Sequence, residues 1–263
     1  MPQMLADRPT VLAGIDDGYA VTKLALSDGR LLGIPSRARV GRSTVSWLQQ
    51  ARSLIFEYDT DGTVYSVGDV DAASTRFEGY AVSGLNRAIV QHALQCADLE
   101  GVHVKAVSGL PVSSFYRSHG ARRRSTIEAK QNNLLIPVIP RSGAQAAEIV
   151  EHKVLPEALA AWYDYVIQIK DGHASVDQAR VRKPVAVVDI GGRTTDTVVV
   201  REKGILHDSS GSCSIGMLDA KQAVGDVLEE HFDLESLDER LLSLALDSNS
   251  IRLYGQDHDV SGA

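Results

Sequence analysis

Two segments of the chain repeat one local plan, and this repeat restricts the fold more than any other feature. Each begins with a short apolar run typical of a buried strand, at 11–15 and at 185–188, followed by an aspartate and a glycine-containing turn. A second strand-like run follows each turn, at 19–27 and at 194–200. The two segments lie about 170 residues apart, which favours a chain built from two similar lobes.

The composition excludes several classes of protein. The chain has 263 residues with 44% hydrophobic and 23% charged side chains, which is ordinary for one large or two smaller globular domains. A net charge of -7 gives no overall attraction to nucleic acid or to an anionic membrane. Two cysteines form no disulfide framework, and neither a signal-peptide-like start nor an apolar run of about 20 residues occurs. We therefore expect a cytoplasmic protein that binds neither membranes nor DNA directly.

Further elements are expected between and after the repeats. The patterns predict a strand at 30–34, a hairpin at 54–67, a helix at 86–97, a strand at 103–110, a strand at 144–154, a helix at 157–165 and a strand at 251–254. The stretch 117–133 is polar and basic, and its central Arg122, Arg123 and Arg124 are expected on a solvated surface or in a filament contact. His119, His152 and His207 show no metal-binding spacing and are expected at the surface.

Both turns have the composition of a phosphate-binding loop. Glycine tolerates positive φ and lets a ligand approach the backbone closely, so several amide N–H groups can point into one space. Lys23 follows on the returning strand, where its ammonium is expected beside a β- or γ-phosphate. The candidate nucleotide-binding residues are Asp16, Asp17, Gly18, Tyr19, Ala20 and Lys23 in the first segment, and Gly191, Gly192, Arg193, Thr194 and Thr195 in the second.

Aspartates at the ends of the two buried strands indicate a metal ion. A carboxylate beside a phosphate repels it unless a cation lies between them, and magnesium takes one or two carboxylates together with phosphate oxygens and water. Asp16 and Asp189 are therefore the candidate metal ligands. Hydrolysis also needs a group that orients a water in line with the γ-phosphate, and Glu157, directly after Pro156 at a helix start, is the candidate.

Each of these features has an ordinary interpretation when taken alone. An Asp-Gly turn is usually a plain hairpin, and a glutamate in the first turn of a helix is favoured by the helix dipole. The nucleotide hypothesis depends on the order of the features along the chain. An acid-glycine hairpin comes first, a Pro-Glu helix start follows, and an acid-Gly-Gly-x-Thr-Thr-Asp hairpin comes last.

That order resembles the actin, Hsp70 and sugar-kinase superfamily, and within it the plasmid-segregation actins of the ParM/StbA type. The resemblance spans roughly residues 11 to 225, and the second hairpin is its most specific part. The matching segments are 14–18 with Lys23, 109–111 with Phe115 and Tyr116, 154–158, 188–196, and 212–216 before the next helix.

The resemblance implies an α/β, two-lobed actin-like (ribonuclease-H-like) ATPase fold. Lobe I is expected at 10–182, with a subdomain IB insertion at about 30–85, and lobe II at 183–263. It implies ATP (or GTP) with Mg²⁺, Asp16 and Asp189 acting around magnesium through water, Asp189 and Glu157 as catalytic residues, and Gly216 at the nucleotide. It also implies ATP-driven self-association into filaments that segregate plasmid or other DNA, with a DNA-binding adaptor protein as partner.

Two departures from the family pattern qualify these expectations. The chain stops at Ala263 without the second glycine-rich loop that binds adenosine in the family, so lobe II is expected to be incomplete and the chain to be a fragment. Tyr19 and Ala20 stand where relatives often carry hydroxyl residues. Two alternatives stay open at this point. One is a small-molecule kinase of the same superfamily, and the other is a nucleotide-binding adaptor that does not polymerise.

Overall fold

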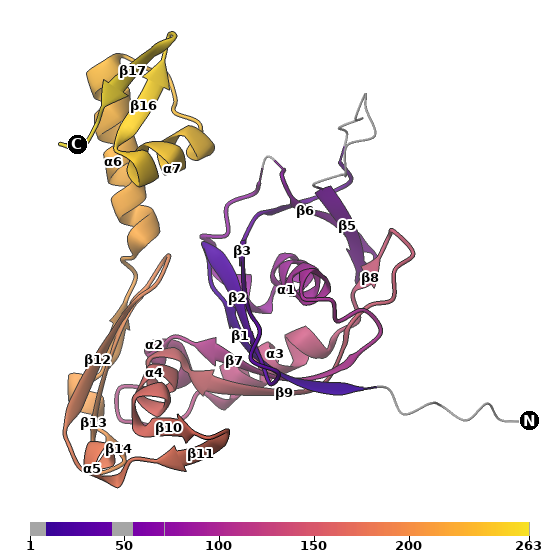
Figure 1. Cartoon of the computed structure of the whole chain (residues 1–263), viewed down its shortest axis with the longest axis vertical. Coiled ribbons are helices and arrows are strands. Elements are labelled where there is room, and N and C mark those ends of the chain that lie inside the picture. Colours follow the sequence, from indigo (N-terminus) through magenta and orange to yellow (C-terminus); the bar gives the residue numbers. More distant parts are fainter. Residues whose placement is uncertain (1–8, 44–54, 71, 263) are drawn as a thin grey trace, which may run out of the picture. The chain divides into compact units, whose positions relative to one another are not determined.

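The computed structural model describes residues 9–43, 55–70 and 72–262. It divides into two compact units, Met1–Ser214 and Ile215–Ala263 (Figure 1). Residues 44–54 and 71 of the predicted insertion lie outside the described residues. The first unit contains the first strands of the expected lobe II, and the boundary between residues 182 and 183 stays a prediction. None of the helices in the described ranges is long and apolar enough to cross a membrane.

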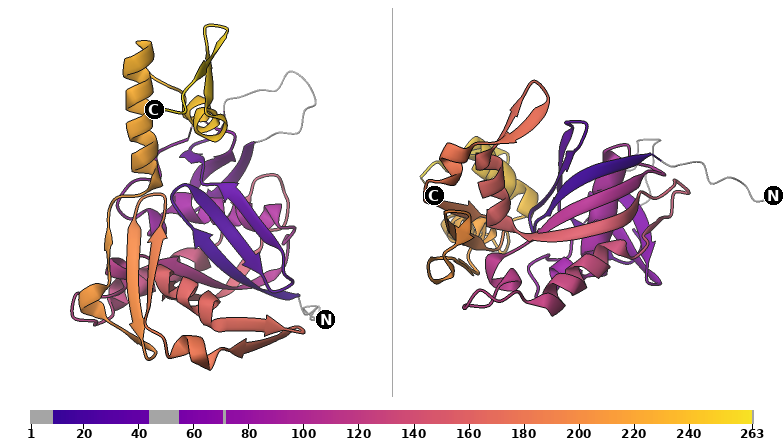
Figure 2. Two further views of the ribbon diagram at one scale, coloured as in Figure 1. Left: turned by 60° about the vertical axis from the view of Figure 1, so that its left-hand side comes forward. Right: turned by 90° about the horizontal axis from the view of Figure 1, so that it is seen from below.

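A five-stranded mixed sheet forms the centre of the first unit, with the order β3-β2-β1-β7-β9. Strands β1 and β2 form the predicted first hairpin, β3 continues it antiparallel, and β7 and β9 run parallel to β1. Figure 2 shows the indigo β1–β2 hairpin from two further sides. The bounds are β1 Thr10–Asp17, β2 Val21–Leu26, β3 Leu31–Pro35, β7 His103–Leu110 and β9 Glu148–Pro156.

Helices α1 (Gly84–Cys96) and α3 (Arg124–Leu135) contribute to the core on one face of this sheet. Helix α1 is buried over most of its length, and its first turn is capped by Ser83, whose hydroxyl accepts from the Asn86 amide at 3.1 Å. Helix α3 was missing from the sequence prediction. Its buried side carries Lys130 and Asn133 beside Leu134, so the apolar helical periodicity that predicts a helix is absent.

A second, smaller sheet packs on the opposite side of α1, so that α1 lies between two sheets (Figure 1). Its antiparallel order is β4-β6-β5-β8, and Tyr58 and Val67 contribute its buried side chains. The predicted hairpin in this region is confirmed, and its turn at Asp61 and Gly62 has positive φ at both residues. The bounds are β4 Ala38–Val40, β5 Ile55–Thr60, β6 Thr63–Gly68 and β8 Ile139–Pro140.

The second predicted hairpin is formed by β12 (Val185–Ile190) and β13 (Thr195–Arg201). Strands β14 (Gly204–Ile205) and β15 (Gly211–Cys213) both pair with β13. Helix α4 (Glu157–Val166) packs on this sheet through Trp162. Short elements complete the unit: η1 Tyr80–Val82, α2 Val112–Phe115, β10 Ile167–Lys170, β11 His173–Val176, α5 Gln178–Val181 and η2 His207–Ser209.

The second unit has its own small core. The unit consists of helices α6 (Met217–Phe232) and α7 (Glu239–Ser248) and a hairpin of β16 (Ser250–Leu253) and β17 (Gln256–Asp259). Leu228, Leu242 and Ile251 are buried in this unit. The strand predicted at 251–254 is confirmed as β16, shifted by one residue.

Candidate functional site

The first hairpin turn, Gly18 to Ala20, has its carbonyl groups held from one side. Ser36 Oγ donates to the Gly18 carbonyl at 2.7 Å, and the Ser36 amide donates to the Ala20 carbonyl at 2.9 Å. Thr75 Oγ1 donates to the Tyr19 carbonyl at 2.6 Å. In a planar trans peptide the next N–H points opposite to the C=O. The amides of Tyr19 and Ala20 are therefore directed away from Ser36 and Thr75, which is the arrangement that an anion-binding turn requires.

Close approach of backbone atoms explains the glycines of both turns. A Cβ at Gly18 would lie 2.9 Å from the Val21 carbonyl oxygen, and one at Gly191 would lie 3.2 Å from the Thr194 carbonyl oxygen. Neither glycine is among those for which the structure gives a positive φ. The sequence argument from positive φ is therefore wrong for these two positions, whereas the argument from space stands.

The second turn is a tight hairpin end with Gly192 and Arg193 at its tip. The Gly191 amide donates to the Thr194 carbonyl at 2.8 Å, and Thr195 begins the returning strand. The Arg193 guanidinium lies over the Tyr19 ring, with 5.3 Å between its Cζ atom and the ring centroid. Side chains from the two predicted phosphate turns therefore meet directly.

The exposed end of the first hairpin carries an ion pair. Lys23 Nζ lies 3.0 Å from Asp16 Oδ2, across the β1–β2 ladder, and both side chains are more than half exposed. The Asp16 carboxylate raises the pKa of Lys23, and the charge of Asp189 adds to that rise. Burial raises the pKa of Asp189, and after it the carboxylates of Asp16 and Asp196 raise it further. The two predicted metal ligands are thus electrostatic neighbours.

Asp17, also predicted to bind nucleotide, turns its carboxylate into the core. Neighbouring strand residues point to opposite faces, so Asp16 is exposed while Asp17 is buried. Its carboxylate pairs with the ammonium of Lys130 from α3, and accepts from Asn86 Nδ2 of α1 at 2.7 Å. This pair anchors the end of β1 to the two helices beneath it.

Glu157 begins α4 beside the end of β7, with Pro156 preceding it at the N-cap. A Cβ at Gly109 would lie 2.3 Å from Glu157 Cγ, so the glycine provides the space for this side chain. Burial raises the pKa of Glu157 to about 8, and the carboxylates of Asp196, Asp17 and Asp16 contribute to the rise. A glutamate with a pKa near neutrality suits proton transfer to or from water.

Asp196, two residues after Thr194, ties the second hairpin to the start of α2, which follows β7 along the chain. It is 1% exposed, and its Oδ1 accepts from the Val112 amide at 2.6 Å and from Ser212 Oγ. Thr194 Oγ1 donates to its other carboxylate oxygen at 3.3 Å. The threonine hydroxyl is therefore engaged within the hairpin.

Two further predictions concern Gly216 and His152. Gly216 lies in the second unit, where its amide donates to Asp219 Oδ2 at 2.8 Å at the start of α6. His152 was expected at the surface, but it is buried and contacts Ser108 Oγ at 2.8 Å, so that prediction is wrong. The described residues contain no group of three or more His, Cys, Asp or Glu side chains arranged to hold a metal ion.

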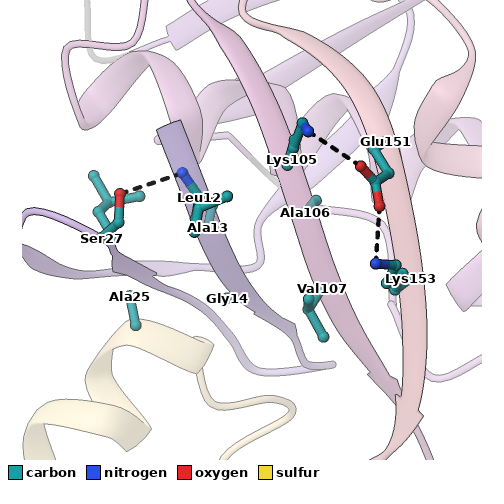
Figure 3. A pocket seen from close by; sticks show the side chains of 11 residues that line it. Leu12, Ala13, Gly14, Ala25, Ser27, Lys105, Ala106, Val107, Glu151 and Lys153 are labelled. Carbon is teal, nitrogen blue, oxygen red and sulfur yellow. Dashed lines mark hydrogen bonds and ion pairs between the residues drawn. The ribbon is translucent and has the colours of Figure 1, made fainter. Parts of the chain in front are cut away.

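A pocket of about 530 Å³ lies on the exposed face of the five-stranded sheet (Figure 3). It is lined by Leu12, Gly14 and Val107, with the ion-paired Lys105, Glu151 and Lys153 at one side. The turn residues, Asp16 and Glu157 are not among its lining residues, so this pocket is separate from the candidate site.

The sequence did not predict four polar residues that bond to the first turn or to Asp17. Ser36, Thr75, Asn86 and Lys130 come from segments far from either turn along the chain. Each is a buried polar side chain. Buried polar groups need partners, but the sequence does not tell which residues will be buried.

Comparison with known families and structures gives a consistent result. The family described as "Plasmid segregation protein ParM, N-terminal" matches residues 12–168, and "Archaeal actin homologue MreB-like, C-terminal" matches residues 187–263. A search of curated proteins found no significant match.

Among solved structures, the archaeal actin homologue Ta0583 has a TM-score of 0.69 and 21% identity, over 94% of this chain and 74% of its own. Its ADP complex gives 0.68 and 20%, over 95% and 76%. A 15-stranded ParM filament from Clostridium botulinum gives 0.68 and 17%, over 96% of this chain and 78% of its own. The predicted α/β actin-like fold is confirmed.

Proposed function

The chain belongs to the family of the plasmid segregation protein ParM, and from this premise we propose that it binds Mg–ATP between its two hairpin turns and hydrolyses it. The observation that supports this most is the contact between the tips of the two turns. Arg193 lies over Tyr19, and after burial the carboxylate of Asp16 raises the pKa of both Asp189 and Glu157. The ADP complex of the similar archaeal actin homologue adds support for a nucleotide ligand.

In this proposal the residues around the two turns have separate roles. The amides of Tyr19 and Ala20, with the turn at Gly191 and Gly192, bind phosphate oxygens. Lys23 contributes a positive charge beside them. Glu157 orients the attacking water and accepts its proton.

Asp16 and Asp189 fit a magnesium site because they lie near the ends of the two strands that lead into the turns and are electrostatic neighbours, and magnesium takes its other ligands from water and phosphate. The bound ion would neutralise charge that develops on the phosphate oxygens. The raised pKa of Asp189, after burial, reflects the neighbouring carboxylate of Asp16, and a cation between them would relieve that repulsion.

We further propose that nucleotide binding drives self-association into filaments in the cytoplasm, and that an adaptor protein links them to plasmid or other DNA. The family match and the similar filament from Clostridium botulinum support this step. A net charge of -7 supports recognition of DNA through an adaptor rather than directly.

The test has two stages. Calorimetric titration with ATP and magnesium measures binding, and phosphate release measures hydrolysis. Glu157→Ala should keep ATP affinity within about threefold and lose at least about 100-fold in hydrolysis rate. If Glu157→Ala hydrolysed ATP at the normal rate, Glu157 would not be the residue that orients the attacking water.

Filament formation is measured separately by light scattering and sedimentation of the unaltered chain with ATP. Scattering that stays flat while ATP binds would contradict the filament proposal and favour a non-polymerising adaptor. ATP turnover that depends on an added small-molecule alcohol would favour a kinase instead.

A further inference from the structure

The side chain of Arg193 has one nitrogen whose hydrogen-bonding capacity is unused. Its Nη1 atom is buried, and it has no hydrogen-bond partner among the described residues. A buried donor without a partner destabilises the folded state, so such groups in folded proteins call for an explanation. The position at the tip of the second turn puts this donor where a ligand of the turns would lie.

Tyr19 holds the guanidinium in place. Its ring lies under Arg193 at 5.3 Å, and it packs in turn on the buried Tyr80, with 5.0 Å between ring centroids. The Tyr19 backbone is fixed by Thr75. A cation over a supported aromatic ring has a restricted orientation, which lowers the entropy lost when it binds a ligand.

The other cations near the two turns already have acidic partners. Lys23 pairs with Asp16 at 3.0 Å, and Lys130 pairs with Asp17 in the core. Arg193 therefore carries a buried guanidinium donor at the tip of the second turn that has no partner among the described residues, and the other such guanidinium atoms, Nε of Arg37 and of Arg39, belong to residues outside the two turns. A guanidinium matches the fork of phosphate oxygens better than an ammonium does.

The neighbours of Tyr19 indicate which phosphate this donor faces. Burial raises the pKa of Tyr19, Arg193 opposes that rise, and the charge of Glu157 adds to it. Arg193 and Glu157 thus both act on one ring. In the proposed function Glu157 orients water next to the γ-phosphate, so a cation within electrostatic range of the same ring is placed toward that phosphate.

We propose that Arg193 donates from Nη1 to the terminal phosphate of a bound nucleoside triphosphate, and that Tyr19 positions it for this contact. Arg193 then distinguishes a triphosphate from a diphosphate and stabilises the charge on the transferred phosphoryl group, as arginines supplied in cis do in other nucleotide hydrolases. This assignment depends on the proposed function, because it requires a nucleotide at the two turns.

The test compares the affinity for two ligands in the presence of magnesium, with ADP and a non-hydrolysable ATP analogue. Arg193→Gln keeps a planar polar group but loses the charge and the Nη1 donor. We expect it to lose at least about tenfold in affinity for the ATP analogue and less than about threefold for ADP. Arg193→Lys should also lose more affinity for the ATP analogue than for ADP, but by a smaller factor than Arg193→Gln. Arg201→Gln, an exposed arginine at the end of the same hairpin, is the matched control and should change neither affinity.

Tyr19→Leu tests the positioning role without removing the cation. It should reduce the affinity for the ATP analogue more than that for ADP, by a smaller factor than Arg193→Gln. If Arg193→Gln and Arg193→Lys each lost the same affinity for both ligands, or lost no affinity, the assignment of Arg193 would be overturned. The proposed function would not be affected by that result. If the unaltered chain bound neither ligand, the proposed function would fail, and this assignment with it.

Discussion

The ammonium of Lys130 lies against the carboxylate of Asp17, and these side chains are only 1% and 5% exposed. The pair joins α3 to the strand that ends at the first turn, and Asn86 donates to the same carboxylate oxygen. A buried ion pair contributes little net stability when both partners are present, but removing one partner leaves an uncompensated charge in the core. The geometry of the first turn therefore depends on both residues.

We predict that Lys130→Met lowers the free energy of unfolding by about 3–5 kcal/mol, because Asp17 is left buried without its partner. Urea denaturation at pH 7 measures the change. The double variant Lys130→Met, Asp17→Leu should recover part of the loss, since the charge is removed from both sides. Lys153→Ala, which breaks an exposed pair with Glu151, is the control and should cost less than about 1 kcal/mol. Equal effects of the buried and the exposed change would contradict the prediction.

A second prediction concerns the space that Gly109 leaves for Glu157. In Gly109→Ala the new Cβ would lie 2.3 Å from Glu157 Cγ, so the glutamate must move. Hydrolysis should fall at least about tenfold while ATP affinity changes little, since a catalytic group displaced by about 1 Å loses most of its effect. Phosphate release and calorimetry measure the two quantities.

The control for this change is another glycine of the same sheet. A Cβ at Gly14 would meet its nearest atoms at 3.8 and 3.9 Å, which is ordinary contact. Gly14→Ala should therefore keep hydrolysis within about twofold of the unaltered chain. A similar fall in both variants would mean that Gly109 has no special relation to Glu157.

The hairpins could be predicted because their signals are local. Residues 11–27 and 185–200 alternate or run apolar across a glycine turn, and such a pattern allows few structures other than paired strands. Helix α3 could not be predicted in this way. Its inward side carries Lys130 and Asn133, whose burial is explained only by Asp17 and Arg87, which come from elsewhere in the chain.

The contacts within the candidate site also could not be predicted from local sequence patterns. Asp16 and Asp17 are neighbours of one residue type, and only the pairing of β1 within the sheet decides which of them is exposed. Ser36 and Thr75 hold the first turn by single hydroxyl groups, and an isolated hydroxyl residue has no sequence signature. Gly109 was noted as part of a strand end, but its relation to Glu157 requires the parallel pairing of β7 with β9.

A third prediction follows from the ionisation of Glu157 in the ligand-free chain. Burial raises its pKa from 4.5 to about 8, so the folded protein binds a proton that the unfolded protein has lost over that range. The stability contributed by this group is therefore lost as pH rises from about 4.5 to about 8. Glu157→Gln removes this loss. Between pH 5 and pH 9, we expect the free energy of unfolding of the variant to rise by at least about 1 kcal/mol relative to that of the unaltered chain.

Denaturation of both proteins at the two pH values measures this difference. Glu128→Gln, at an exposed position of α3, is the control and should show no such gain. A constant difference between Glu157→Gln and the unaltered chain across this range would contradict the raised pKa.

The last prediction concerns His92, a buried residue of α1 that contacts Tyr58 of the smaller sheet. Tyr58 donates its hydroxyl to Gln95 Oε1 at 2.7 Å, so His92 Nδ1, at 2.8 Å from the same hydroxyl, is the donor in their contact. Burial lowers the pKa of His92 from 6.5 to about 4. The neutral ring thus contributes stability that is fully present above about pH 6.5 and is lost as pH falls toward 4, where the unfolded chain binds a proton that the folded chain does not.

Between pH 7 and pH 4 this group alone accounts for roughly 3 kcal/mol of lost stability. His92→Gln cannot titrate, so its free energy of unfolding should fall by about 2–3 kcal/mol less over the same interval, although it is less stable at pH 7. Urea denaturation at pH 7, 5.5 and 4 measures both curves. His119→Gln changes an exposed histidine and should leave the slope unaltered. Parallel curves for His92→Gln and the unaltered chain would show that the ring is protonated in the folded state, which the contact with Tyr58 and the burial of His92 both oppose.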